Sequence, residues 1–189
     1  MAFLKSQITR KFLLTAILAW GVFAYAQNAS NDLLLFSMIG ISIFGLFVIW
    51  SELSPIFILI LLSFTSGHAL YSILYQMSLP LWFAMIGTLI IFSYLFTYVE
   101  QKIGILGDKR LIYLVLFALI ILEVFLVLSY FLIDPTSQGL IISSVSYLFV
   151  GFCYTVLARH TDNNFVTYAL ITILAMTIVF LTSNWGGLV

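Results

Sequence analysis

Charged residues are scarce in this 189-residue chain, because only 7% of its positions are Asp, Glu, Lys or Arg. Soluble domains carry about 25% charged residues. Hydrophobic residues make up 63% of the chain, too many for a surface that faces water, and we therefore expect lipid to be its solvent. The formal net charge is zero, so no overall basic field is available to attract nucleic acid, and we expect no nucleic-acid partner.

Cysteine and histidine are almost absent, and their scarcity excludes several chemistries. The single cysteine, Cys153, excludes an internal disulfide and a cysteine-rich metal site. The two histidines, His68 and His160, lack the spacing of a His-Glu-x-x-His zinc protease. Ser66 lies two residues from His68, so on one helix the two point apart, unlike the pair of an intramembrane serine protease. We expect no cofactor, no metal site and no catalytic residue.

Proline is also rare, and its three positions mark expected helix starts. Pro55 follows Ser54 and Pro135 follows Asp134, and a capping residue before proline at the first helical position is a start signal. Apolar runs between polar breaks then predict an all-α membrane bundle of about seven spans, as one domain over residues 1–189. The spans are expected near residues 12–26, 33–50, 55–75, 79–99, 111–133, 140–158 and 165–182.

Lysine and arginine are distributed unevenly between the two sides of this expected bundle. With a cytoplasmic N-terminus, all seven fall on the cytoplasmic side, and the loops on the other side contain none. Because such residues are retained in the cytoplasm during insertion, we expect the N-terminus inside and the C-terminus outside. The general layout resembles that of short multi-pass proteins of bacteria, which implies a bacterial plasma membrane. The cations are Lys5, Arg10, Lys11, Lys102, Lys109, Arg110 and Arg159.

The first 26 residues allow a second interpretation. They have a basic start, a short apolar run and Ala24-Tyr25-Ala26 before Gln27, which is also the layout of a cleavable signal peptide. Cleavage there would leave six spans. We expect the segment to be retained, because multi-pass proteins usually keep their first span.

Two ionisable side chains, Glu123 and His68, lie deep in expected spans. They are 12 and 13 residues into their spans, which at 1.5 Å per residue places both ~18–20 Å from the same face. An acid inside the hydrocarbon costs at least ~2.5 kcal/mol. We therefore expect Glu123 to face the bundle interior and to meet a polar partner there, first His68 and next Ser144 or Tyr147. The alternative is that each group bonds separately to a neighbouring hydroxyl or carbonyl.

Polar side chains near these two groups extend the candidate site. Tyr71 and Tyr75 share a helix face with His68, while Ser143 and Tyr147 lie in the outer half of span 140–158. The candidate ligand- or proton-binding residues are Glu123, His68, Tyr71, Tyr75, Ser143 and Tyr147.

A stripe of residues, all small except Tyr147, recurs every four positions in the sixth span, at Gly139, Ser143, Tyr147, Gly151 and Thr155. Small residues let membrane helices approach closely. The stripe therefore predicts either helix packing within the chain or a contact with other membrane subunits. Membrane lipid is the other partner that we expect.

Three functions remain open from the sequence. The first is a small transporter or membrane-embedded ligand-binding protein with its polar centre at Glu123 and His68. Spans 2–4 and 5–7 form two triplets of inverted orientation, each with a capped proline on its middle helix, which is typical of transporter repeats. The second is a structural or accessory subunit of a larger membrane complex, and the third is an intramembrane enzyme acting on lipid. The residues favour the first without identifying a substrate.

Overall fold

The computed structural model describes residues 7–28, 32–77, 79–104, 106–131, 133–157 and 164–183, and these residues form helices without any strand. The predicted all-α fold with seven helices is confirmed within these ranges. A 3₁₀ turn, η2 (Gly107–Lys109), precedes α5, and a π-helical segment, η3 (Cys153–Leu157), ends α6. The helices are α1 (Gln7–Asn28), α2 (Asp32–Ser51), α3 (Pro55–Gln76), α4 (Leu81–Ile103), α5 (Arg110–Ser129), α6 (Pro135–Phe152) and α7 (Asn164–Thr182).

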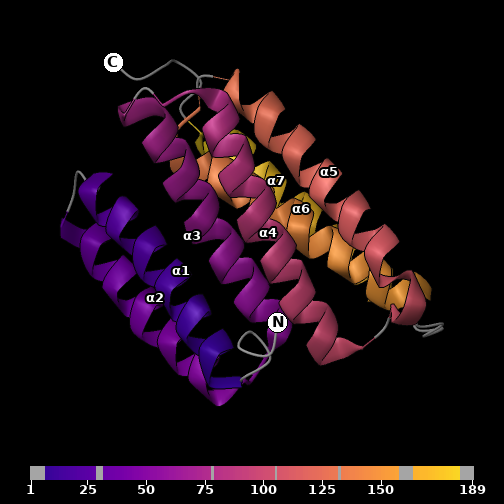
Figure 1. Cartoon of the computed structure of the whole chain (residues 1–189). Coiled ribbons are helices and arrows are strands. Elements are labelled where there is room, and N and C mark those ends of the chain that lie inside the picture. Colours follow the sequence, from indigo (N-terminus) through magenta and orange to yellow (C-terminus); the bar gives the residue numbers. More distant parts are fainter. Residues whose placement is uncertain are drawn as a thin grey trace.

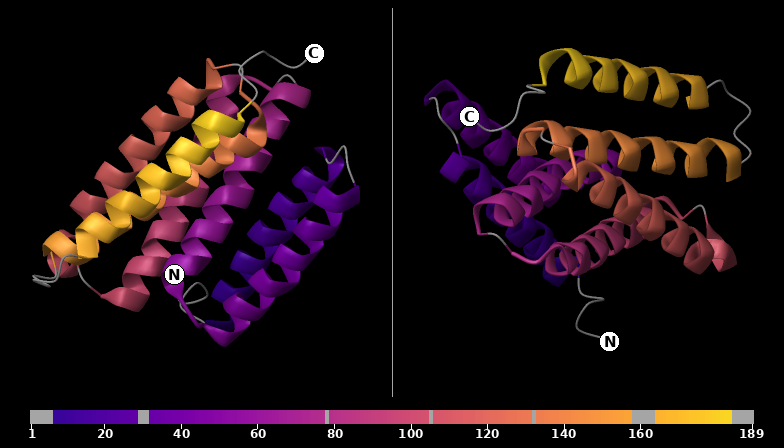
Figure 2. Two further views of the ribbon diagram at one scale, coloured as in Figure 1. Left: turned by 180° about the vertical axis from the view of Figure 1, so that it is seen from behind. Right: turned by 90° about the horizontal axis from the view of Figure 1, so that it is seen from above.

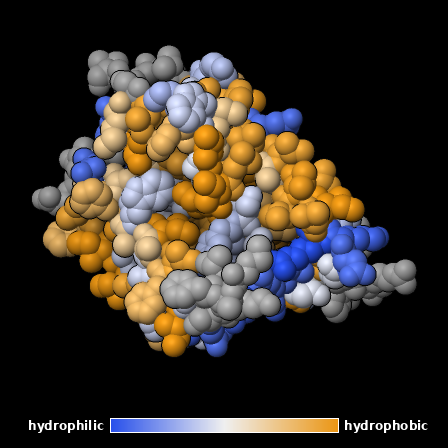
Figure 3. Space-filling model, viewed as in Figure 1, coloured by the Kyte–Doolittle hydropathy of each residue, from blue (hydrophilic) through white to orange (hydrophobic). Residues whose placement is uncertain are grey.

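Helix length and composition identify an integral membrane protein. Six helical segments of the described chain are long and apolar enough to cross a membrane, and α2 adds a shorter apolar stretch over Leu35–Ser51. Hydrophobic residues dominate the face shown in Figure 3, and the largest hydrophilic area on that face lies at its lower right. An outer surface of this kind is compatible with lipid around the bundle.

Consecutive helices run in opposite directions, and α3 lies at the centre (Figure 1). Its most extensive contacts are with α6, followed by α1 and α4, while α2 packs mainly on α1 and α7 mainly on α6 (Figure 2). We call the end of the bundle where α2 gives way to α3 the Glu52 end. The opposite end, where α6 begins, is the Asp134 end.

Local sequence chemistry explains where the helices begin and stop. Ser54 accepts a hydrogen bond from the Phe57 amide at 3.3 Å, and Asp134 accepts one from the Ser137 amide at 2.9 Å, each directly before a proline. The cap at Asp134 starts α6 five residues before the expected span. Gly104 stops α4 with φ +70°, a conformation that only glycine adopts at little cost.

The described cations gather at one end of the bundle. Arg10 and Lys11 lie in the first turns of α1, Lys102 in the last turn of α4, and Lys109 and Arg110 at the start of α5. All five therefore lie at the Glu52 end, as expected from the alternation of the spans. Lys5 and Arg159 lie outside the described residues.

The first helix is an integral part of the core. Leu14 and Leu18 of α1 are 0% and 1% exposed. Gly21 packs so closely on α3 that a Cβ added there would lie 2.6 Å from the Cβ of Thr65. Removing α1 would therefore uncover a face of α3 that the remaining helices do not cover.

The small-residue stripe of α6 faces other helices of the same chain. A Cβ on Gly139 would lie 2.8 Å from the Phe64 carbonyl oxygen of α3, and one on Gly151 would lie 2.4 Å from the Tyr168 ring of α7. Ser143 and Thr155 are buried as well. Packing on α3 and α7 favours the helix-packing interpretation of the stripe. A contact between this face and another subunit stays a prediction.

Candidate functional site

His68 lies in a buried polar cluster between α3 and α6. Its side chain is 2% exposed, with Nε2 3.2 Å from the Ser72 hydroxyl and Nδ1 3.4 Å from the Thr136 hydroxyl. The ring of Tyr25, from α1, lies 4.7 Å from the imidazole ring. Gly139 makes this approach possible, because its missing Cβ lets α6 lie against the backbone of His68. His68 therefore lies in the interior of the bundle.

Gln138 forms a second polar junction one turn into α6. Its side-chain amide donates to the Tyr75 hydroxyl at 2.7 Å and to the Leu128 carbonyl at 2.8 Å. The residue is 0% exposed, and its Oε1 atom has no hydrogen-bond donor among the described residues. Gln138 thus ties α3, α5 and α6 together at the Asp134 end, and sequence reasoning did not single it out.

The other predicted polar residues of α3 and α6 do not meet in one place. The Tyr71 hydroxyl donates to the Phe125 carbonyl of α5 at 2.9 Å, and Ser143 donates to the Ile60 carbonyl of α3 at 3.0 Å. Tyr147 packs its ring against Tyr168 of α7, with 4.9 Å between the centroids. These contacts join pairs of helices at separate places, and Tyr75 reaches Gln138.

The predicted interior position of Glu123 is wrong. Glu123 is exposed on the outer face of α5, and no described residue forms a hydrogen bond or an ion pair with it. The buried face of α5 contains Ile121 and Phe125, and Glu123 lies two residues from each. At 100° per residue the carboxyl group therefore points about 200° away from the core. The expected Glu123–His68 pair does not form, and neither Ser144 nor Tyr147 replaces His68 as a partner.

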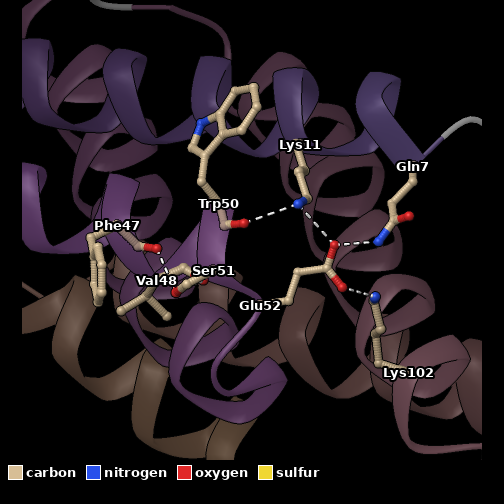
Figure 4. A network of polar contacts seen from close by, with 8 residues as sticks. All are labelled: Gln7, Lys11, Phe47, Val48, Trp50, Ser51, Glu52 and Lys102. Carbon is tan, nitrogen blue, oxygen red and sulfur yellow. Dashed lines mark hydrogen bonds and ion pairs between the residues drawn. The ribbon is translucent and has the colours of Figure 1, made fainter.

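A polar network at the Glu52 end joins three helices (Figure 4). The Glu52 carboxylate accepts from Gln7 and pairs with Lys11 of α1, at 3.0 Å, and with Lys102 of α4. The Lys11 ammonium also donates to the Trp50 carbonyl at 2.9 Å. Glu52 itself has a left-handed backbone conformation, with φ 56°, where the chain turns from α2 into α3.

The donors around Glu52 keep its carboxyl group ionised. Hydrogen bonds from Lys102, and then from Lys11 and Gln7, lower the pKa of Glu52 from 4.5 to about 2. All three ionisable side chains are partly exposed, between 19% and 31%. Each ion pair alone therefore stabilises the fold little.

The Glu52 network was also not predicted from the sequence, although the sequence contains a signal for it. The predicted topology placed Lys11, Glu52 and Lys102 on the same side of the bundle. Glu52 is the single acid of its short loop, and the segments predicted on the same side contain Lys11 and Lys102. An ion pair is to be expected in such a place. What the sequence lacked was the spatial order of the helices, which brings α1 and α4 to the two sides of that loop.

Comparisons with protein-family models, with curated proteins and with solved structures give no match to this chain. Within the described ranges, no group of three His, Cys, Asp or Glu side chains is placed to hold a metal ion. Any functional proposal must therefore start from the polar groups described above.

Proposed function

We propose that this protein is a subunit of a larger membrane complex and that it docks through the outer face of α5. The observation that carries the proposal is the exposed position of Glu123 within a helix that is apolar enough to span a membrane. A carboxyl group needs hydrogen-bond donors, and lipid chains offer none. A partner helix is the simplest source of such donors.

The depth of Glu123 makes contact with water difficult. Glu123 lies 13 residues after Arg110 and six before Ser129, which is ~20 Å and ~9 Å along the helix. Side chains on a helix tilt toward its N-terminus, so the carboxyl group points away from the nearer end. Left in lipid, an acid near the bilayer centre costs at least ~2.5 kcal/mol.

The surroundings of Glu123 on α5 match the seam of a helix pair. Ile112, Leu116, Leu119, Glu123 and Tyr130 are all exposed, and their spacings of four, three, four and seven residues are those of a heptad repeat. This period is typical of left-handed pairs of helices, and a single polar residue within such a seam sets partner and register. A helix packed here would cover Glu123 together with the apolar side chains around it.

Charge complementarity favours a different protein over a second copy of this chain. The described Lys and Arg residues lie at the Glu52 end and none lies at the depth of Glu123. A second copy packed through α5 in the same orientation would bring another Glu123 to that depth and no Lys or Arg. We propose that the partner contributes a transmembrane helix with Lys, Arg, Asn or Gln opposite Glu123.

Photocrosslinking in native membranes tests this proposal. A photoreactive amino acid at Leu119, one turn from Glu123, should crosslink to a transmembrane segment of another protein that contains such a donor. The same group at Leu174, on the exposed face of α7, is the matched control and should give no such adduct. Glu123→Leu should reduce the Leu119 adduct at least tenfold, whereas Glu123→Gln should keep most of it, because an amide still accepts hydrogen bonds.

Three results would contradict the docking proposal. An adduct between two copies of α5 would show a homodimer instead. Equal adducts at Leu119 and Leu174 would show random collisions in the membrane. An adduct that Glu123→Leu leaves unchanged would show that the carboxyl group takes no part.

A second candidate function is binding of a small polar ligand near His68. The protein would then be a membrane-embedded receptor or transporter in which Glu123 takes no part. It is favoured by the Gln138 Oε1 atom, which is buried and lacks a donor among the described residues. A density map of the chain in lipid nanodiscs should then show a molecule larger than water within hydrogen-bonding distance of Oε1. An ordered water or a protein donor in that place would contradict this candidate.

A further inference from the structure

A polar pocket of about 320 Å³ opens beside the Glu52 network, between α1 and α4. Its wall contains Arg10 and Lys11 from α1, Glu52 from the α2–α3 turn, and Tyr98, Gln101 and Lys102 from α4. Three other pockets of the described bundle, between α1 and α2, between α3 and α4, and between α4 and α6, are almost entirely apolar. This pocket is therefore suited to a charged group, which the others are not.

The charge of the pocket is positive. Three cations and one carboxylate line it, so its formal charge is +2. The carboxylate already accepts from Gln7, Lys11 and Lys102, which nearly fills its lone pairs and leaves little attraction for a further cation. An ammonium group has three N–H donors, and Lys102 directs one of them to Glu52. The remaining donors of Lys102 therefore favour an anion.

The position of the pocket indicates which anion. It lies at the ends of spanning helices, at the level where phosphate groups of lipid head groups are found. Lys and Arg near this level attract anionic lipids. The polar groups hold the two lysines at fixed positions before any ligand arrives, which is what a specific site needs and a mobile basic tail lacks.

We infer that this pocket binds the phosphate group of a molecule whose head group or whole structure has a net negative charge. Arg10 and Lys102 bind the phosphate oxygens, and Glu52 positions the lysines without touching the ligand. The phosphate belongs either to an anionic lipid head group or to a soluble phosphate compound. The inference does not depend on a partner at α5, because the Glu52 end and Glu123 are separate parts of the bundle.

Native mass spectrometry of the full chain in detergent tests the inference with three probes: phosphatidylglycerol, phosphatidylcholine and inorganic phosphate. We expect phosphatidylglycerol to be retained at least tenfold better than phosphatidylcholine, whose head group has no net charge. Lys102→Gln should lower this retention at least fivefold, and Lys102→Arg should restore it. Thermal unfolding of each variant shows whether it is folded.

Lys109→Gln is the matched control, since it removes the same charge at the same end from an exposed side chain that does not line the pocket. It should change retention less than twofold. Equal losses in Lys109→Gln and Lys102→Gln would overturn the site and leave only general attraction to a basic surface. Equal retention of the two lipids overturns the lipid source, and saturable binding of inorganic phosphate that Lys102→Gln abolishes would then assign the site to soluble phosphates. Failure of all three probes to bind would overturn the inference.

Discussion

Replacing Gly139 with alanine should lower the free energy of unfolding of the bundle by about 2–3 kcal/mol. The added Cβ would lie 2.8 Å from the Phe64 carbonyl oxygen and 2.9 Å from the His68 amide nitrogen, both of them backbone atoms of α3. Backbone atoms cannot move aside as a side chain does, so α3 and α6 must separate. Separation would weaken the contact of Thr136 with His68 and the hydrogen bond from Ser143 to α3.

Gly40→Ala is the matched control for this experiment. Gly40 is also within a helix, but a Cβ there meets nothing within 4 Å. Alanine should leave stability unchanged or raise it by up to about 1 kcal/mol, because glycine is a poor helix former. Unfolding of both variants in detergent micelles can be followed by circular dichroism. A Gly139→Ala variant as stable as Gly40→Ala would show that α3 and α6 are not in close contact.

The second large effect is expected for Phe117→Ala, at about 3 kcal/mol of lost stability. Phe117 is 0% exposed, and its ring packs against Phe96 of α4 and Phe149 of α6, with centroid distances of 4.8 and 5.3 Å. Alanine would leave a cavity where three helices meet. The value lies at the low end for such changes, because lipid is as apolar as the core and only the lost packing counts.

Leu119→Ala provides the comparison for Phe117, since it lies two residues on and is 52% exposed. It should change stability by less than about 0.5 kcal/mol in the isolated chain. The pair of variants thus measures how α5 is rotated about its axis. A larger effect at Leu119 than at Phe117 would place the aromatic face outside, and Glu123 with the core.

Helix existence and helix starts were predictable because the information is local. The capped prolines at Pro55 and Pro135 define the start of each helix through a hydrogen bond three residues away, and nothing distant is needed. The apolar runs likewise predict spans from their own composition.

Helix rotation was not predictable for α5, and this explains the error at Glu123. Nearly every side chain of α5 is apolar, so the sequence has no polar face that distinguishes inside from outside. The core selects the aromatic rings of Phe117 and Phe125, which stack on Phe96 and Tyr71 of other helices. The expectation for Glu123 considered the cost of lipid contact within one chain only. A carboxyl group on the outer face also avoids the cost of lipid contact when another chain covers it.

The central place of α3 has a consequence for how the protein is made. Ser143 of α6 reaches the Ile60 carbonyl of α3 across 83 positions of sequence, a length that a ribosome adds in ~4–17 s. For most of that interval, from the end of α3 at Gln76 to the start of α6 at Pro135, α3 is already synthesised while the helix that covers its serines and His68 is still missing. The insertion machinery, or water retained beside it, must shelter those groups until α6 arrives. Assembly of the core is therefore a late event, completed only when most of the chain has left the ribosome.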